Sequence, residues 1–283
     1  MSAVLGANSY GKSAIRLVKV VRTGDRHEIR DFTVDVALEG VFERAHTAGD
    51  NSMVLPTDTM KNTVYAKARE HPVREPEDFA RVLVEHFLNA SSAAARARVR
   101  VAEHSWRHVD VDGRPHDTTF ERAGGEQRMA EVSLARGAEP RVCAGIDRLL
   151  VLKSAHSAFA GYPRDRYTTL RETDDRILAT SISTKWRYRD GAASYGALFA
   201  GVRRALLAAF AEHDSKSVQH TLYAMGQRVI DTCGEVDEVS ITMPNKHHLL
   251  VDLLPFGLDN PNEIFVSTSE PYGLIRGTVS RGR

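Results

Sequence analysis

Several features are scarce in this chain of 283 residues, and each scarcity excludes a class of protein. There are only two cysteines, Cys143 and Cys233, and they lack CxxC spacing, so neither a disulfide framework nor a zinc knuckle is indicated. Buried, reduced thiols are the default interpretation. The 38 basic residues barely exceed the 37 acidic ones. A net charge of +1 argues against nucleic acid as a partner, because phosphate recognition usually needs a basic excess.

Membrane and export signals are missing as well. The first residues, MSAVLGANSYGKSAIRL, do not have the basic-then-apolar layout of a signal peptide. The longest helical apolar run, near residues 205–211, is too short to span a bilayer. The final SRGR is not a peroxisomal address. We therefore expect a cytoplasmic protein with no membrane partner.

Cofactor motifs are also lacking. The chain has no glycine-rich phosphate loop and no dinucleotide fingerprint. Glu103, His104, His108 and His116 can be assembled on paper into a cation site. However, a histidine spacing of four serves a metal only on a helix, and this segment has a strand pattern. The sequence predicts that the protein works without a metal or organic cofactor.

Hydrophobic periodicity predicts the elements of the first half. Residues 15–21 are rich in β-formers, Thr23–Arg26 offers a turn, and residues 32–38 alternate apolar with polar, which predicts a hairpin with one buried face. Pro76 opens an amphipathic helix, and we expect a second helix in the small-residue segment 90–95. Further strands are predicted around 99–101, 109–111 and 129–134.

The second half repeats this order. Predicted strands at 148–153 and 177–186 precede helices around 198–206 and 218–229, and closing strands follow at 239–254 and 263–279. A tandem duplication explains the repeat, with domains at 1–138 and 139–283 in the α+β class. Because sheets with helices on one face leave strand edges open, we expect an oligomer.

The stretch NSMVLPTDTMKNTVY, residues 51–65, places reactive groups where an apolar run ends. Thr57 and Asp58 follow Pro56 directly, and junctions of this kind often carry function. The alternative is that Thr57 or Asp58 is a helix N-cap whose oxygen accepts from free backbone amides.

Two polar pairs in the second half are candidates for ligand binding. Asn245 and His247 lie two apart in ITMPNKHHLLVDL, so in a strand they share one face and offer an amide and an imidazole together. The alternative is an ordinary surface histidine. Val218 and Gln219 begin a helix after the plausible caps Asp214, Ser215 and Ser217, where free amides favour an anion or a polar heterocycle. An ordinary helix start is the alternative.

Three further residues allow both a structural and a functional interpretation. Arg176 lies beside Asp174 and Asp175 in the sequence. It either forms a surface ion pair with one of them or binds a planar, anionic ligand through its guanidinium group. Phe159 lies in a glycine- and proline-containing loop, where it stacks on a ring or anchors the loop. Lys12, in SYGKSAI, is one of many lysines, and only an interacting partner would give it a functional role.

Six blocks in order along the chain resemble the urate oxidase family. They are SYGK, DNSMVLPTDTMKNTVYA, FAGYPRDRYTTLRETDDRILAT, SVQHTLYAMG, MPNKHHLLVDL and GLIRGTV. The resemblance implies two tandem tunnelling-fold domains, each an antiparallel four-stranded sheet with two helices on one face. It further implies a homotetramer, a dimer of barrel-forming dimers with a central tunnel and active sites at subunit interfaces.

The resemblance also implies a reaction and a set of roles. Urate, dioxygen and water give 5-hydroxyisourate and hydrogen peroxide without a cofactor. By resemblance, Arg176 and Gln219 grip the urate anion, Phe159 stacks on its ring, the Val218 amide donates a hydrogen bond and Ile275 forms an apolar wall. Thr57 and Asp58 enter from a neighbouring subunit. Lys12 and Thr57 move protons with His247, while Asn245 and Thr57 hold dioxygen or water.

Departures from the fungal pattern of this family are small: Pro56 precedes Thr57, and AGYPRD follows Phe159.

Two rival functions remain. A pterin or purine hydrolase of the same fold would need a Cys and His metal set that the sequence does not assemble. A non-catalytic purine-binding scaffold would need a broken set of catalytic residues.

Overall fold

The computed structural model describes residues 3–282, which form two compact units. The first unit extends to Gly145 and includes Arg187–Gly196. The second comprises Ile146–Trp186 and the chain from Ala197 onward. We describe each unit by itself.

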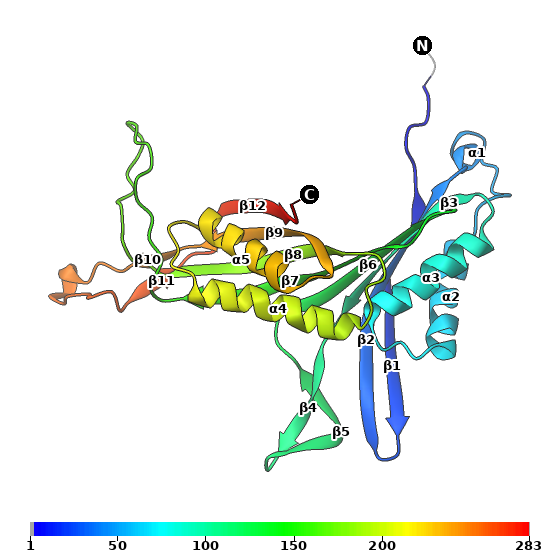
Figure 1. The fold of residues 1–283 in the computed structure, drawn as a ribbon, viewed down its shortest axis with the longest axis horizontal. Coiled ribbons are helices and arrows are strands. Elements are labelled where there is room, and N and C mark those ends of the chain that lie inside the picture. The colour runs from blue at the N-terminus through cyan, green and yellow to red at the C-terminus, as the bar shows by residue number, and fades with distance from the viewer. Residues whose placement is uncertain (1–2, 283) are drawn as a thin grey trace. The chain divides into compact units, whose positions relative to one another are not determined.

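The first unit is built on four antiparallel strands in the order β1-β2-β3-β6. Helices α2 and α3 lie on this sheet, and β4 and β5 form a separate hairpin (Figure 1). Its elements are β1 (Tyr10–Thr23), β2 (Arg26–Gly40), α1 (Glu43–Thr47), α2 (Thr57–Glu70), α3 (Pro76–Ala90), β3 (Ala94–Glu103), β4 (Trp106–Val111), β5 (Arg114–Arg122) and β6 (Gln127–Ala135).

Alternation along the strands determines which face is buried. In β3, Ala97, Val99 and Val101 are fully buried, whereas the arginines between them are exposed on the other face. The predicted hairpin at residues 15–38 and the predicted helix from Pro76 are both confirmed. Apolar side chains at helical spacing in α3, including Phe79 and Phe87, complete this core.

The second unit repeats the plan with the strand order β7-β8-β9-β12, and α5 packs against β9 and β12. Figure 1 shows α4 and α5 together on these strands. The elements are β7 (Arg141–Lys153), which begins in the first unit, β8 (Leu178–Tyr188), α4 (Tyr195–Glu212), α5 (Val218–Thr232), β9 (Val236–Lys246), β10 (His248–Leu250), a 3-10 turn (Leu254–Phe256), β11 (Phe265–Ser267) and β12 (Gly273–Ser280).

Two element predictions are wrong. Residues 90–95 do not form a helix, because α3 ends at Ala90 and β3 begins at Ala94; the other long helix described in this unit is α2. The closing strands are also shorter than predicted. The first ends at Lys246, where the chain leaves the β12 partner and pairs with β11 instead. The second begins only at Gly273, after Pro271, which has no N–H for the sheet.

Basic side chains from the sheets satisfy the carbonyl groups at the helix ends. Lys19 Nζ donates to the carbonyls of Ala68 (2.7 Å) and His71 (2.6 Å) at the end of α2. In the second unit, Lys153 donates in the same way at the end of α4, to Phe210 (3.3 Å) and His213 (2.5 Å). Carbonyl groups at helix C-termini lack intrahelical donors. A cation there also interacts favourably with the negative end of the helix dipole.

Both cysteines are buried and unbridged. Within residues 3–282, none of the helices has the length and apolar character needed to cross a membrane.

Two helical glycines differ in their surroundings, which gives a test of the packing of α5. A Cβ atom at Gly226 of α5 would lie 2.5 Å from the Val279 side chain of β12, whereas at Gly201 of α4 it would meet only Cys233 Sγ, at 4.0 Å. We expect Gly226→Ala to lower the free energy of unfolding by about 1–3 kcal/mol through overpacking. Gly201→Ala, the matched control, should raise it by about 0.5–1 kcal/mol. Urea unfolding measures both, and a stable Gly226→Ala variant would contradict this packing.

Candidate functional site

Three of the predicted site residues lie together in the first unit. Lys12 is in β1, next to a register shift between Lys12 and Ile15. Thr57 and Asp58 are the first two residues of α2. The pKa of Asp58 is lowered mainly by Lys61 and, to a smaller degree, by the positive charge of Lys12. Helix α2 also packs against β1, the strand that carries Lys12.

A phenol joins the same two elements. The backbone N–H of Leu55, just before α2, donates to Tyr10 Oη at 2.8 Å. The Tyr10 ring also packs edge-on against Phe42, with 4.7 Å between centroids. Burial raises the pKa of Tyr10 above its usual value, although the Leu55 hydrogen bond opposes the shift. Tyr10 lies two residues before Lys12 on β1. It therefore anchors to β1 the segment that leads into α2.

The capping alternative for Thr57 and Asp58 is wrong. Pro56 occupies the N-cap position, with no side-chain cap, and Thr57 is already helical. Asp58 binds Lys61 at 2.5 Å and Asn62 at 3.1 Å instead. Within residues 3–282, the Thr57 hydroxyl makes no hydrogen bond.

In the second unit, two isolated bridges hold the segment that carries Phe159. The N–H of Phe159 donates to the Thr173 carbonyl at 2.8 Å, and Thr173 returns a bond of 3.2 Å. On the other side, Ala158 N–H donates to the Ser215 carbonyl at 2.8 Å. The segment therefore connects the loop before β8 with the loop before α5.

Arg176 and Phe159 form a stacked pair. The guanidinium carbon lies 5.1 Å from the centroid of the Phe159 ring. Burial lowers the pKa of Arg176, and its Nε is buried without an acceptor. The expected alternative, an ion pair with Asp174 or Asp175, does not form in the described structure. Asp175 instead accepts from the Ser157 backbone N–H at 3.2 Å.

The start of α5 presents free backbone donors beside this pair. Ser217 is the N-cap, and its Oγ accepts from the His220 N–H at 3.1 Å. Of the next two residues, Val218 is buried and Gln219 is exposed. Both precede the first turn's internal hydrogen bonds, so their amides face outward with the positive end of the helix dipole.

Strands β9 and β12 place Asn245 and Ile275 near each other. Asn245 pairs with Gly273, and Ile275 pairs with Met243 on the same ladder. A Cβ atom at Gly273 would lie 3.8 Å from both Asn245 Cβ and Ile275 Cδ1. Gly273 therefore places no side chain of its own beside these two residues.

His247 lies outside the strand that its spacing assumes. The strand stops at Lys246, and His247 falls between β9 and β10, with its carbonyl accepting from Thr268 N–H at 2.9 Å. Strand periodicity consequently does not place His247 on the face of Asn245.

The residues of the alternative metal site make other contacts. His104 Nε2 lies 2.8 Å from Thr33 Oγ1, His108 Nδ1 lies 2.6 Å from the His116 carbonyl, and Glu103 pairs with Arg128 at 3.7 Å. Across residues 3–282, no three groups of the His, Cys, Asp and Glu type gather as metal ligands.

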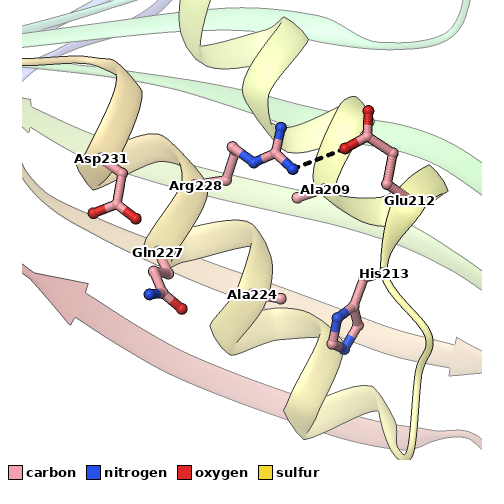
Figure 2. Close-up of a pocket in the computed structure, with 7 residues that line it drawn as sticks. All are labelled: Ala209, Glu212, His213, Ala224, Gln227, Arg228 and Asp231. Atoms are coloured by element: carbon pink, nitrogen blue, oxygen red, sulfur yellow. Dashed lines mark hydrogen bonds and ion pairs between the residues drawn. The ribbon is translucent and has the colours of Figure 1, made fainter.

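A polar cavity of about 400 Å³ lies elsewhere, between α4 and α5 (Figure 2). Its walls include His213 and an ion pair of 2.8 Å between Glu212 and Arg228. None of the predicted site residues lines it, so this cavity is not the predicted ligand site.

Sequence patterns missed three residues of these clusters. Tyr10 contacts Leu55 across 45 positions, and no local pattern signals such a contact. Tyr162 stacks on Phe159 with centroids 4.9 Å apart, and an aromatic three residues away in the same loop was the available signal. Gly273 is relevant because it adds no side chain beside Asn245. The sequence does not show that these two residues are strand partners.

Comparison with known proteins gives a consistent set of relatives. The family model described as uricase matches residues 8–133 and 142–276. The chain is 49% identical to the uricase of Arthrobacter globiformis, over 98% of this chain and 90% of that protein. It is 37% identical to the uricase of Aspergillus flavus, over 99% and 98% of the two chains.

Solved structures agree with these sequence relatives. The crystal structure of uricase from Arthrobacter globiformis matches with a TM-score of 0.95 at 48% identity, covering 99% of this chain and 96% of that one. Urate oxidase from Bacillus sp. TB-90 shares the fold, with a TM-score of 0.84 at 21% identity over 97% and 100% of the chains.

The Tyr10 contact gives a test of how β1 and α2 are held together. In Tyr10→Phe, the Leu55 amide loses its acceptor, so its hydrogen exchange should accelerate and the free energy of unfolding should fall by about 1 kcal/mol. Tyr65→Phe, at an exposed position of α2, is the control and should change neither quantity. Unchanged exchange at Leu55 in Tyr10→Phe would show that the hydrogen bond does not fix this segment.

Proposed function

Because this chain belongs to the uricase family, we propose that it is a urate oxidase that works without a metal or organic cofactor. Urate, dioxygen and water are converted to 5-hydroxyisourate and hydrogen peroxide, as a step of purine degradation. The proposal extends to two tandem tunnelling-fold domains, at 1–138 and 139–283, supported by the repeated element order and the repeated lysine caps.

The observation that carries the proposal is the pairing of Arg176 with Phe159. A half-buried guanidinium without an acid partner, stacked on an aromatic ring, suits a planar anion. In this proposal Arg176 and Gln219 grip the urate anion from two sides, and the Val218 amide donates a further hydrogen bond. Phe159 stacks on the purine ring, and Ile275 closes the pocket as an apolar wall.

Proton transfer is assigned to groups from both units. Urate is electron-rich once deprotonated, so the protein mainly needs to hold the anion, remove a proton and seat dioxygen. Threonine is a weak acid by itself, and Lys12 is the amine that enables Thr57 to pass a proton. His247 continues the relay, while Asn245 and Thr57 hold dioxygen or water above the ring.

The active site is proposed to be shared between subunits of a homotetramer. Lys12, Thr57 and Asp58 form one cluster, and the urate-binding residues belong to the second unit. In the proposed assembly, Thr57 and Asp58 reach into the pocket of a neighbouring copy. Two barrel-forming dimers then stack around a central tunnel, with urate and dioxygen as the only other partners and no nucleic acid or membrane.

We propose the cytoplasm as the compartment, since the thiols of Cys143 and Cys233 are buried and form no disulfide within the described residues, which fits a reducing environment.

Turnover in chelator tests the reaction and its independence of metal together. Purified protein in excess EDTA should consume urate, followed by its ultraviolet absorbance, and release an equal amount of peroxide. Absence of turnover, with and without chelator, would refute the enzyme. Turnover that chelator abolishes would refute only the metal-free mechanism.

Separate variants test the division of labour. Lys12→Ala and Thr57→Ala should each reduce kcat by about 100-fold or more, because general acid–base groups contribute on that scale. Anaerobic urate binding should change little in both variants. Arg176→Ala should weaken binding as well as turnover.

Lys67→Ala, which removes an ion pair with Glu70 on α2 and none of the predicted site residues, is the control and should match wild type in urate binding and turnover. Equal loss of urate binding in the Lys12, Thr57 and Arg176 variants would contradict the separate roles.

A further inference from the structure

Matching arginine caps align the two units residue by residue. Arg136 follows β6 directly, and Arg281 follows β12 directly. Each guanidinium donates through Nη2 to three carbonyls at the end of the preceding helix and the start of the next strand. These are Leu88, Ser91 and Ala94 for Arg136, and Ile230, Cys233 and Val236 for Arg281. The identical spacing makes α3 the counterpart of α5, β3 of β9 and β6 of β12.

This alignment gives residues of the candidate site counterparts in the first unit. Gln219 is the second residue of α5, and Glu77 is the second residue of α3. The β9–β12 ladder ends at the pair Asn245 and Gly273, and the β3–β6 ladder ends at Glu103 and Arg128. Amides in the second unit therefore correspond to carboxylates in the first, and the open position at Gly273 corresponds to an arginine.

The Arg128 guanidinium lies among these carboxylates. Its Nη2 is 2.7 Å from Glu77 and 2.8 Å from Glu75, and its Nη1 is 3.7 Å from Glu103. Only 11% of the Arg128 side chain is exposed, and Glu77 is completely buried. Strand β6 thus supplies a planar cation at the position that Gly273 leaves empty in the second unit.

Glu77 shows that this place is built to hold a charged group. One of its oxygens binds Arg128, while the other, Oε1, is buried without a partner. Burial raises the pKa of Glu77 to about 7, even though Arg128 opposes the shift. A fully buried carboxylate is costly without a counter-charge, so its presence indicates a site for a cation.

We propose that the first unit contains a second ligand pocket of the same construction as the candidate site, specific for a planar cation and filled by the chain's own Arg128. The carboxylates of Glu77 and Glu103 replace the neutral amides of Gln219 and Asn245, which reverses the charge that the pocket selects. The proposal concerns this unit alone and does not depend on the reaction at the other site.

Chemical rescue tests the pocket directly. Arg128→Ala removes the guanidinium and leaves an opening of its shape, so the variant should melt at a lower temperature than wild type. Ethylguanidinium, which matches the deleted atoms, should raise the melting temperature of this variant saturably at millimolar concentration. N-ethylurea, its neutral and planar analogue, and ethylammonium, which is not planar, should each give a smaller rise.

Two control proteins define the result. Wild type, whose pocket is filled, should show no saturable rise with ethylguanidinium. Arg100→Ala, which removes a half-exposed arginine paired with Glu131 on β3, should likewise show none. A rise of similar size in all three proteins, or none in Arg128→Ala, would overturn the proposal.

A second variant covers the case in which Arg128→Ala does not fold. Arg128→Ala combined with Glu77→Gln removes one buried charge as well, and the remaining Glu75 and Glu103 should still bind ethylguanidinium. If neither variant folds alone, ethylguanidinium should restore the yield of folded protein on refolding. Failure to restore it, under conditions that refold wild type, would also overturn the proposal.

Discussion

A guanidinium that is half-buried but has no acid partner is the constraint on which the second unit depends. Burying the Nε of Arg176 without an acceptor has a free-energy cost of about 1–3 kcal/mol, which a bound anion would offset. The bridges from Phe159 to Thr173 and from Ala158 to Ser215 hold the stacking ring beneath this group. The same bridges hold the loop before α5, so the first backbone donors of this helix have a fixed place.

Lysine and arginine side chains cap the helix ends in the same way in both units. Lysines on β1 and β7, and arginines after β6 and β12, satisfy the last carbonyls of all four long helices. The two arginines hold the ends of α3 and of α5 at equivalent places on their sheets. At equivalent positions of their ladders, the second unit has Gly273 and the first has Arg128. This difference, together with the exchange of amides for carboxylates, distinguishes the two units at this place.

Periodicity predicted the parts of the fold in which one face is buried. The alternation at residues 32–38 and the stripe from Phe79 to Phe87 both became core. Helix α2 escaped this method because it buries only Met60, Val64 and Ala68 in a polar sequence. The strand through His247 was predicted too long, because the change of partner from β12 to β11 is a tertiary event that local sequence does not encode.

The candidate site was predictable mainly from family resemblance. Spacing alone left Arg176 as a possible surface ion pair and Thr57 as a possible cap, and only the structure removed both alternatives. Tyr10, which ties β1 to the entry of α2, and Gly273 were invisible because their roles arise from contacts between distant segments. Hydrophobic periodicity therefore predicted much of the fold, whereas the surroundings of the candidate site residues depend on contacts between distant segments.

A crystal structure of the protein with a non-oxidisable purine analogue tests the central claim most directly. We predict the analogue between Arg176 and Gln219, stacked on Phe159, with Thr57 of a neighbouring copy at its edge. Analogue bound in the cavity between α4 and α5, or a pocket completed by one chain alone, would contradict the account.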